Sequence, residues 1–304
     1  MAGEIRHPAM PMRQSEASFH EIRDLRYHVR RWPHSGAPKV VLLHGWMDVS
    51  ASFQFLVDEL RGEWDVYAPD WRGYGLTDWA KADCYWFPDY IADLDFILQE
   101  IDAREPVNLV GHSLGGNVAS LYAGIRPGRV ARLVNLEGFG LPLTRPEQAP
   151  GRYSLWLDEL RERRQLRPYA NFAELESRLR AGNPRLTAER ATFLARHWGR
   201  EGEDGSVVLR GDPAHKIVNP QLYRYEEAVA CWREVTAPVL WVEGAQSETM
   251  KRMKVDPAHV AERRAAFRNL RFASVPEAGH MLHHDQPEAV ARLIEEFLGD
   301  QQDP

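Results

Sequence analysis

The sequence predicts an α/β fold, in which a mainly parallel central sheet is flanked by helices and carries an α-helical cap insertion. Two observations predict it. Short, continuous apolar segments alternate with helical patterns in both end regions of the chain, which is typical of a parallel sheet buried on both faces. Between these regions, helical patterns continue but strand alternation disappears. We therefore expect a core domain over residues 19–141 and 231–304, a helical cap over residues 142–230, and a loose N-terminal tail over residues 1–18.

The composition excludes several classes of protein. The chain has 304 residues, of which 44% are hydrophobic and 27% charged, so it can bury a substantial core. Its net charge of −6 argues against a nucleic-acid-binding protein, and no apolar run reaches the roughly 18–20 residues of a membrane span. The first 18 residues lack the apolar segment of a secretory signal. Cys84 and Cys231 lie far apart in the sequence and do not have the spacing of metal ligands, so we interpret them as free thiols in a reducing cytoplasm. We expect a cytoplasmic protein that binds neither nucleic acid nor membrane; the oligomeric state is left open.

The first half of the chain contains the opening strands of the sheet. Residues 19–32 alternate between polar and apolar side chains, which predicts an antiparallel hairpin. Residues 40–43 form a continuous apolar run, which is typical of a strand buried on both faces, and residues 65–69 are expected to form another strand. Residues 90–101 place apolar side chains on one face of an amphipathic helix, and a further buried strand is expected over residues 130–136.

The second half contains the cap and then returns to the sheet. The expected elements are three cap helices, two strands and a closing helix, near residues 153–166, 171–181, 187–198, 238–242, 270–275 and 287–298. Asp285 and Glu288 have the spacing of an N-cap residue and its capping-box partner, so we assign both to the start of the closing helix.

A strand-like segment over residues 106–110 runs into Gly111-His112-Ser113-Leu114-Gly115, and a helical segment follows at once. This is the G-x-S-x-G pattern, in which a serine lies on a tight turn between a strand and a helix. Such a turn forces the serine to a positive φ, and glycines on either side keep Cβ atoms out of the crowded region. The pattern predicts Ser113 as a nucleophile.

A serine nucleophile needs an adjacent base, because its hydroxyl is weakly nucleophilic at neutral pH. His280 is the candidate, since it lies on a loop directly after the last expected strand. The set His280, His283, His284 and Asp285 resembles a metal cluster, but no further ligands accompany it and we expect no metal site.

The reaction also needs N–H groups that stabilise a developing oxyanion. The strand over residues 40–43 ends in His44-Gly45-Trp46, where the Trp46 N–H can face the Leu114 N–H. We expect both amides to form the oxyanion hole, and His44 to have a structural role.

Four motifs resemble the α/β-hydrolase superfamily in order and spacing over about residues 20–298: His44-Gly45-Trp46, Asp70-x-Arg72-Gly73-x-Gly75, Gly111 to Gly116, and Ala278-Gly279-His280. The segment His44 to Asp48 with Ser52-Phe53 is similar to the serine-hydrolase-like branch. The resemblance implies Ser113 as nucleophile, His280 as base, an oxyanion hole from the Trp46 and Leu114 amides, and no cofactor. It places the insertion where that family carries its cap.

The acid of the triad departs from the usual pattern of the family. The family commonly has an aspartate three residues after the glycine that ends the seventh strand; here that glycine is Gly244 and the position is Ser247. Glu248 follows and is the acid that we favour. Glu137, at the end of the strand over residues 130–136, is the alternative, because some members carry the acid there.

The serine favours attack on an acyl carbon, whereas haloalkane dehalogenases and epoxide hydrolases of this fold use an aspartate. We expect hydrolysis of a small to medium, partly apolar ester or thioester. The alternatives are a serine-dependent carbon–carbon hydrolase or acyltransferase, and a non-catalytic binding protein on the same scaffold. Nine aromatic residues are candidates for the lining of an apolar pocket, although most aromatic side chains on such elements pack into the core: Trp46, Trp79, Tyr85, Trp86, Phe87, Phe139, Tyr153, Trp156 and Trp198.

Overall fold

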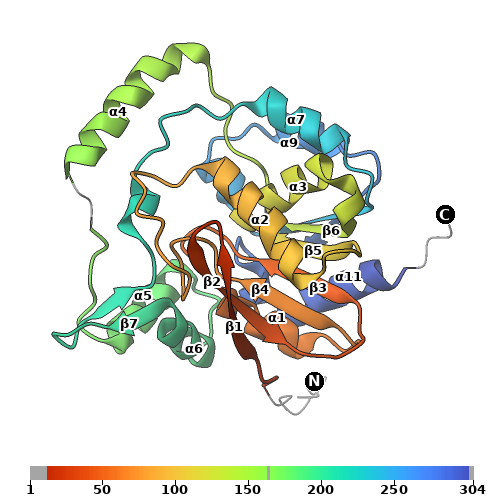
Figure 1. Cartoon of the computed structure of the whole chain (residues 1–304), viewed down its shortest axis with the longest axis horizontal. Coiled ribbons are helices and arrows are strands. Elements are labelled where there is room, and N and C mark those ends of the chain that lie inside the picture. The colour runs from red at the N-terminus through yellow and green to blue at the C-terminus, as the bar shows by residue number, and fades with distance from the viewer. Residues whose placement is uncertain (1–11, 163–164, 301–304) are drawn as a thin grey trace, which may run out of the picture.

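The computed structural model describes residues 12–162 and 165–300, and in them an eight-stranded sheet lies between two layers of helices (Figure 1). The strand order is β1-β2-β4-β3-β5-β6-β9-β10. The strands are β1 (Glu16–Ile22), β2 (Leu25–Trp32), β3 (Lys39–Leu43), β4 (Asp65–Pro69), β5 (Val107–His112), β6 (Val130–Leu136), β9 (Val239–Gly244) and β10 (Leu270–Val275). The six strands from β4 to β10 in this order are parallel, and β1 and β2 form the antiparallel edge. The predicted fold class is confirmed.

The predicted N-terminal tail is too long. Strand β1 begins at Glu16, and the Arg13 N–H donates to the Asp58 carboxylate at 2.8 Å. Residues 13 and 16–18 are therefore tied to the core. Residues 1–11 of the predicted tail lie outside the described residues.

Helices cover both faces of the sheet because its central strands are apolar on both sides. One face packs against α1 (Gln54–Glu59) and α11 (Pro287–Gly299). The other packs against α2 (Phe87–Ile101), α3 (Leu114–Ile125), α7 (Tyr225–Arg233) and α9 (Pro257–Ala265). Two short helices, α8 (Thr249–Arg252) and α10 (Leu282–Asp285), lie in the loops after β9 and β10. The predicted amphipathic helix is confirmed as α2, which buries Leu94, Ile97 and Leu98.

The insertion between β6 and β9 contains the three predicted helices, α4 (Ala149–Glu162), α5 (Phe172–Gly182) and α6 (Ala188–Trp198). It also contains a small antiparallel pair that the sequence did not predict, β7 (Gly199–Glu201) and β8 (Val207–Leu209). In Figure 1 these elements lie beside the core, with α4 separate from α5 and α6. Helix α7 crosses residue 230, the expected end of the cap, and it packs on α3 with Trp232 in the main core. The expected boundary at residue 230 therefore cuts through a core helix.

The α5–α6 part of the insertion is bonded to the loops that follow the strands of the core. The Trp198 indole N–H donates to the Ser52 hydroxyl at 3.0 Å, and the Asn183 amide donates to the Asp285 carboxylate at 2.6 Å. Asp285 also accepts from the Gly279 N–H at 2.8 Å. The assignment of Asp285 as an N-cap is therefore wrong: the residue before α11 is Gln286, and it makes no side-chain capping bond. Asp285 instead connects the cap to the loop that carries His280.

Candidate active site

Ser113 lies on the tight turn that the sequence predicted, between β5 and α3. Its backbone has φ 51° and ψ −112°, a conformation that side chains rarely adopt. The turn depends on its glycines: a Cβ on Gly111 would lie 2.4 Å from the Gly115 carbonyl oxygen, and a Cβ on Gly115 would lie 2.1 Å from the Leu43 carbonyl oxygen. The chain therefore accepts a strained backbone at Ser113 in order to hold its hydroxyl at the carboxyl edge of the sheet.

Three side chains form a continuous chain of hydrogen bonds from this turn. The Ser113 Oγ lies 3.1 Å from His280 Nε2, and His280 Nδ1 lies 3.0 Å from Glu137 Oε2. The predicted pair of Ser113 and His280 is thus brought together. A carboxylate on Nδ1 requires the proton on that nitrogen and leaves the Nε2 lone pair facing the serine hydroxyl. We call this set the catalytic chain.

Glu137 is held by several bonds at the end of β6. It is 1% exposed, and Oε1 accepts from the Gly244 N–H at 2.7 Å. Oε2, which faces His280, also accepts from the Ser247 hydroxyl. Like Ser113, Glu137 has a positive φ, 59°, directly after a strand. These bonds fix the orientation of the carboxylate before any substrate arrives.

The expectation that Glu248 is the acid partner of His280 is wrong, because Glu137 is the glutamate that contacts His280. The Glu248 side chain is 70% exposed and lies 3.8 Å from Lys251, one turn along α8. Ser247 occupies the position where the family commonly has its aspartate. Its hydroxyl donates to the carboxylate of Glu137, which follows the neighbouring strand β6. Strands β6 and β9 are adjacent and parallel, so a carboxylate at the end of either strand can reach the same histidine.

The two residues predicted to supply the oxyanion amides lie at the expected places, Trp46 in the loop after β3 and Leu114 at the start of α3. A Cβ on Gly45 would lie 3.3 Å from the Ser113 Cβ, so the loop after β3 runs directly against the serine. Leu114 is the first residue of α3, where N–H groups have no partner within the helix. Trp46 and Leu114 both line the cavity beside Ser113.

His44 has the structural role that the sequence suggested. Its Nε2 accepts from the Trp71 N–H at 2.9 Å, while Nδ1 donates to the Gly45 carbonyl oxygen at 2.8 Å. Burial lowers the pKa of His44 to about 4, so its ring is neutral near pH 7. The neutral ring holds the loop after β3 against the turn that follows β4.

A cavity of about 430 Å³ lies between core helices and the insertion, and Leu114, the residue after Ser113, is part of its wall. This volume is within the roughly 300–1,000 Å³ typical of sites for small ligands. Four of the nine aromatic candidates line it: Trp46, Tyr85, Trp86 and Phe87. Phe139 is instead buried in the main core, and Trp198 is bonded to Ser52.

His215 is a cavity residue that the sequence analysis missed. It comes from the insertion, and its ring stacks between Tyr74 and Tyr85, with ring centroids 3.7 Å and 3.6 Å away. Its carbonyl oxygen accepts from the Trp46 indole N–H at 3.3 Å. Burial lowers the pKa of His215 to about 3, so the ring is neutral near pH 7 and stacks as an uncharged aromatic group. No local pattern around residue 215 indicates this role, because both stacking partners come from the core.

Comparisons with known proteins agree with this fold. The model of the alpha/beta hydrolase family matches residues 40–293. A serine hydrolase-like protein of Danio rerio is 27% identical over 275 residues, which cover 88% of this chain and 83% of that protein. A serine hydrolase-like protein of Dictyostelium discoideum is 25% identical over 305 residues, which cover 95% of this chain and 82% of that protein.

Among solved structures, the thioesterase domain from the curacin biosynthetic pathway has the same fold. It superposes with a TM-score of 0.82 at 24% identity, over 92% of this chain and 99% of that domain. No helix within the described residues combines the length and the apolar character that crossing a bilayer requires. Since the family model spans most of the sequence, the chain belongs to the alpha/beta hydrolase family.

Proposed function

We propose that the protein is a serine hydrolase that cleaves a small to medium, partly apolar carboxylic ester or thioester through an acyl-enzyme on Ser113. The observation that carries the proposal is the catalytic chain, in which Ser113, His280 and Glu137 are hydrogen-bonded in sequence. Membership of a hydrolase family supports the reaction class. The names of the two serine hydrolase-like relatives support the choice of nucleophile.

In the first half of the reaction, the Ser113 oxygen attacks the carbonyl carbon while His280 Nε2 takes the hydroxyl proton. The carbonyl oxygen becomes an oxyanion and accepts hydrogen bonds from the Trp46 and Leu114 N–H groups, each worth roughly 3 kcal/mol. Glu137 stabilises the imidazolium and does not take its proton. When the intermediate collapses, His280 donates the proton to the leaving alcohol or thiol, and the acyl group stays on Ser113.

In the second half, water attacks the acyl carbon and gives its proton to His280. Collapse of this second intermediate returns the proton to the Ser113 oxygen and releases the carboxylic acid. No cofactor enters either step. Water is the co-substrate, and the bonds broken and formed balance without an oxidant or reductant.

The cavity supports an apolar acyl or alcohol group of moderate size. Its wall combines aromatic and aliphatic side chains, and it reaches Trp46 and Leu114, the two residues whose amides we assign to the oxyanion. A substrate whose carbonyl oxygen bonds these amides therefore extends its chain along an apolar surface, which favours burial at roughly 25 cal/mol per Å².

The test is hydrolysis of p-nitrophenyl esters of increasing chain length by the wild-type protein and by Ser113→Ala, with fluorophosphonate labelling in parallel. We expect turnover with an optimum at a short to medium chain, labelling of Ser113, and loss of both in the variant. A Ser113→Ala variant that keeps its turnover would contradict the assignment of the nucleophile.

Two other results would replace the proposal. Labelling of Ser113 without turnover of any ester would favour a carbon–carbon hydrolase or an acyltransferase, since the activated serine would be present but simple esters would be poor substrates. Absence of both labelling and turnover would favour a binding protein on the same scaffold.

A further inference from the structure

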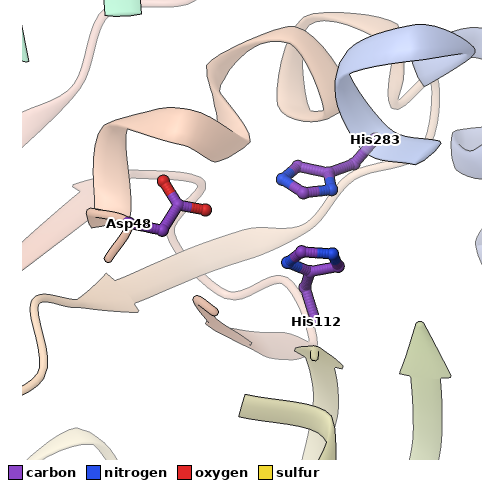
Figure 2. A group of neighbouring side chains, drawn as sticks. All are labelled: Asp48, His112 and His283. Carbon is purple, nitrogen blue, oxygen red and sulfur yellow. The ribbon is translucent and has the colours of Figure 1, made fainter. Parts of the chain in front are cut away.

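A second group of polar side chains is buried next to the turn that carries Ser113. Asp48 follows β3, His112 is the last residue of β5, and His283 lies in α10, and their side chains converge on one space (Figure 2). One potential ligand atom from each lies within 4.8 Å of the other two. All three residues are at most 2% exposed. We call this set the buried histidine cluster.

The cluster contains polar atoms that find no partner in the part of the chain that the structure describes. These are Asp48 Oδ2, His112 Nδ1 and both ring nitrogens of His283. A buried polar atom without a hydrogen bond costs roughly 1–3 kcal/mol, so folded proteins rarely contain several together. All three residues carry such atoms, and one potential ligand atom from each lies within 4.8 Å of the others, which indicates that the space between them holds a ligand.

The bonds on the outer side of the cluster orient its lone pairs inward. His112 Nε2 lies 2.8 Å from the His280 carbonyl oxygen, which can only accept, so Nε2 carries the proton and Nδ1 carries the lone pair. Asp48 Oδ1 accepts from the Val49 N–H at 2.8 Å and from the Ser52 hydroxyl, which leaves Oδ2 as the free oxygen. A histidine that donates one ring N–H to a carbonyl and presents the other nitrogen is the usual arrangement of a metal-bound imidazole.

We propose that Asp48, His112 and His283 bind one divalent transition-metal ion, with Zn²⁺ as the best fit. Two imidazoles and one carboxylate suit zinc and its first-row neighbours, whereas Ca²⁺ and Mg²⁺ prefer oxygen ligands. Bonds of roughly 2.0–2.2 Å in a tetrahedral site place ligand atoms about 3.3–3.5 Å apart, so binding draws the three side chains inward by about an ångström. The fourth position is left for water.

This set differs from the one that the sequence analysis considered and rejected. Of that set, His280 belongs to the catalytic chain, and Asp285 is bonded to Gly279 and Asn183. Asp48 and His112 are far from His283 in the sequence, and no spacing rule for metal ligands connects the three residues. Only the fold brings them together.

The ion would act as a positioning element for the active-site loop. His112 holds the backbone of His280 through its Nε2–H, so fixing the His112 ring also fixes the loop that carries the base. His112 immediately precedes Ser113, and its ring centroid lies 4.8 Å from that of His280, so the bound ion would be a close neighbour of the catalytic chain without containing any of its residues. The inference is independent of the proposed function, since it concerns binding and stability.

The test is titration of metal-depleted protein with Co²⁺ and Zn²⁺, followed by visible absorption of the Co²⁺ complex, metal content after dialysis, and the thermal midpoint of unfolding. We expect one ion per chain, visible absorption bands of an imidazole-bound Co²⁺, and a rise in the midpoint, because the unfolded chain lacks the site. Asp48→Asn and His283→Asn should each weaken binding by at least about 100-fold.

Two matched variants control for other histidines. His284→Asn changes the neighbouring buried histidine of the same helix, and His34→Asn changes an exposed one; both should retain the bound ion. Asp48→Asn keeps the shape of the side chain, so it remains informative if His283→Asn fails to fold. The proposal is overturned if wild-type protein fails to bind one ion per chain, because water alone would then fill the space. Equal binding by wild type, Asp48→Asn and folded His283→Asn overturns it as well.

Discussion

The catalytic chain and the buried histidine cluster meet at the end of β5, where His112 and Ser113 are consecutive, and they differ in how their polar atoms are satisfied. In the catalytic chain, each group that the reaction needs is hydrogen-bonded to the next, from serine to histidine to carboxylate. In the cluster, two histidines and one aspartate are buried, and four of their polar atoms have no partner among the described residues. The comparison teaches that one arrangement is complete within the chain, whereas the other is complete only with a ligand.

The largest expected effect separates the two sites by function. Ser113→Ala should lower kcat/KM for p-nitrophenyl esters by about 10⁴-fold or more, because the nucleophile is removed. The same variant should bind Co²⁺ with the affinity of the wild type, since the Ser113 hydroxyl is bonded to His280 and is not one of the cluster's ligand groups. Steady-state kinetics and a Co²⁺ titration on one preparation measure both. A parallel loss of metal affinity would show that the two sites are one unit.

The next effect concerns the turn that both sites share. Gly115→Ala should lower the free energy of unfolding by roughly 3 kcal/mol, because its Cβ would lie 2.1 Å from backbone at Leu43. Gly128→Ala is the matched control: a Cβ there meets nothing within 4 Å, so the change should stay within about 0.5 kcal/mol. Urea unfolding measures both variants. Equal stabilities would mean that the turn adapts to a side chain more easily than its geometry indicates.

Buried neutral histidines also predict a loss of stability in acid. Burial lowers the pKa of His44 to about 4 and that of His215 to about 3. Between these values and about 6.5, the unfolded chain binds protons that the folded chain does not, so the free energy of unfolding falls as the pH falls. The stabilisation is complete above about pH 6.5, and each histidine removes about 1.4 kcal/mol per pH unit below it.

One carboxylate opposes this trend. In metal-depleted protein, burial raises the pKa of Asp48 to about 7, so protonation of Asp48 favours the folded state as the pH falls from 7 towards 4. Because two histidines oppose this single carboxylate, the free energy of unfolding should still fall as the pH falls. Urea unfolding from pH 7 to about pH 5 measures the slope, and His215→Phe, which keeps the stacked ring, should make it shallower. Stability that rises steadily over this range would contradict the account.

The smallest effect tests whether Trp46 acts through its backbone. Trp46→Leu should raise KM by about 3- to 10-fold, because it removes cavity wall and the indole bond to His215, and it should change kcat little. The amide that we assign to the oxyanion remains in the variant. Kinetics that separate kcat from KM decide the point: a fall of kcat by two orders of magnitude would assign the indole to the chemistry.

Much of the fold follows from local patterns in the sequence. The apolar strands, the amphipathic α2 and the glycines around Ser113 each impose their structure over a few residues, so the core and the pairing of Ser113 with His280 could be predicted. The β7–β8 pair could not, because its strands have three residues each and show no clear alternation. The start of β1 was placed too late for a similar reason, since its first residues are exposed.

The acid and the buried histidine cluster depend on contacts between distant parts of the chain. Both glutamates follow strands that point to the same edge of the sheet, and sequence alone does not show which one faces His280. The structure distinguishes Glu137, because it shares with Ser113 a positive φ directly after a strand. A residue other than glycine keeps this backbone conformation only when the surrounding structure enforces it. The cluster has no signal in sequence spacing at all.

The most direct test of the central claim compares Glu137→Gln with Glu248→Gln in p-nitrophenyl ester hydrolysis. Glu137→Gln keeps the size of the side chain but removes the charge that orients His280 and stabilises its imidazolium, so kcat should fall by about 10²- to 10⁴-fold. Glu248→Gln, at an exposed position away from the site, should retain nearly full turnover. The opposite result, an active Glu137→Gln and an inactive Glu248→Gln, would contradict the catalytic chain described above.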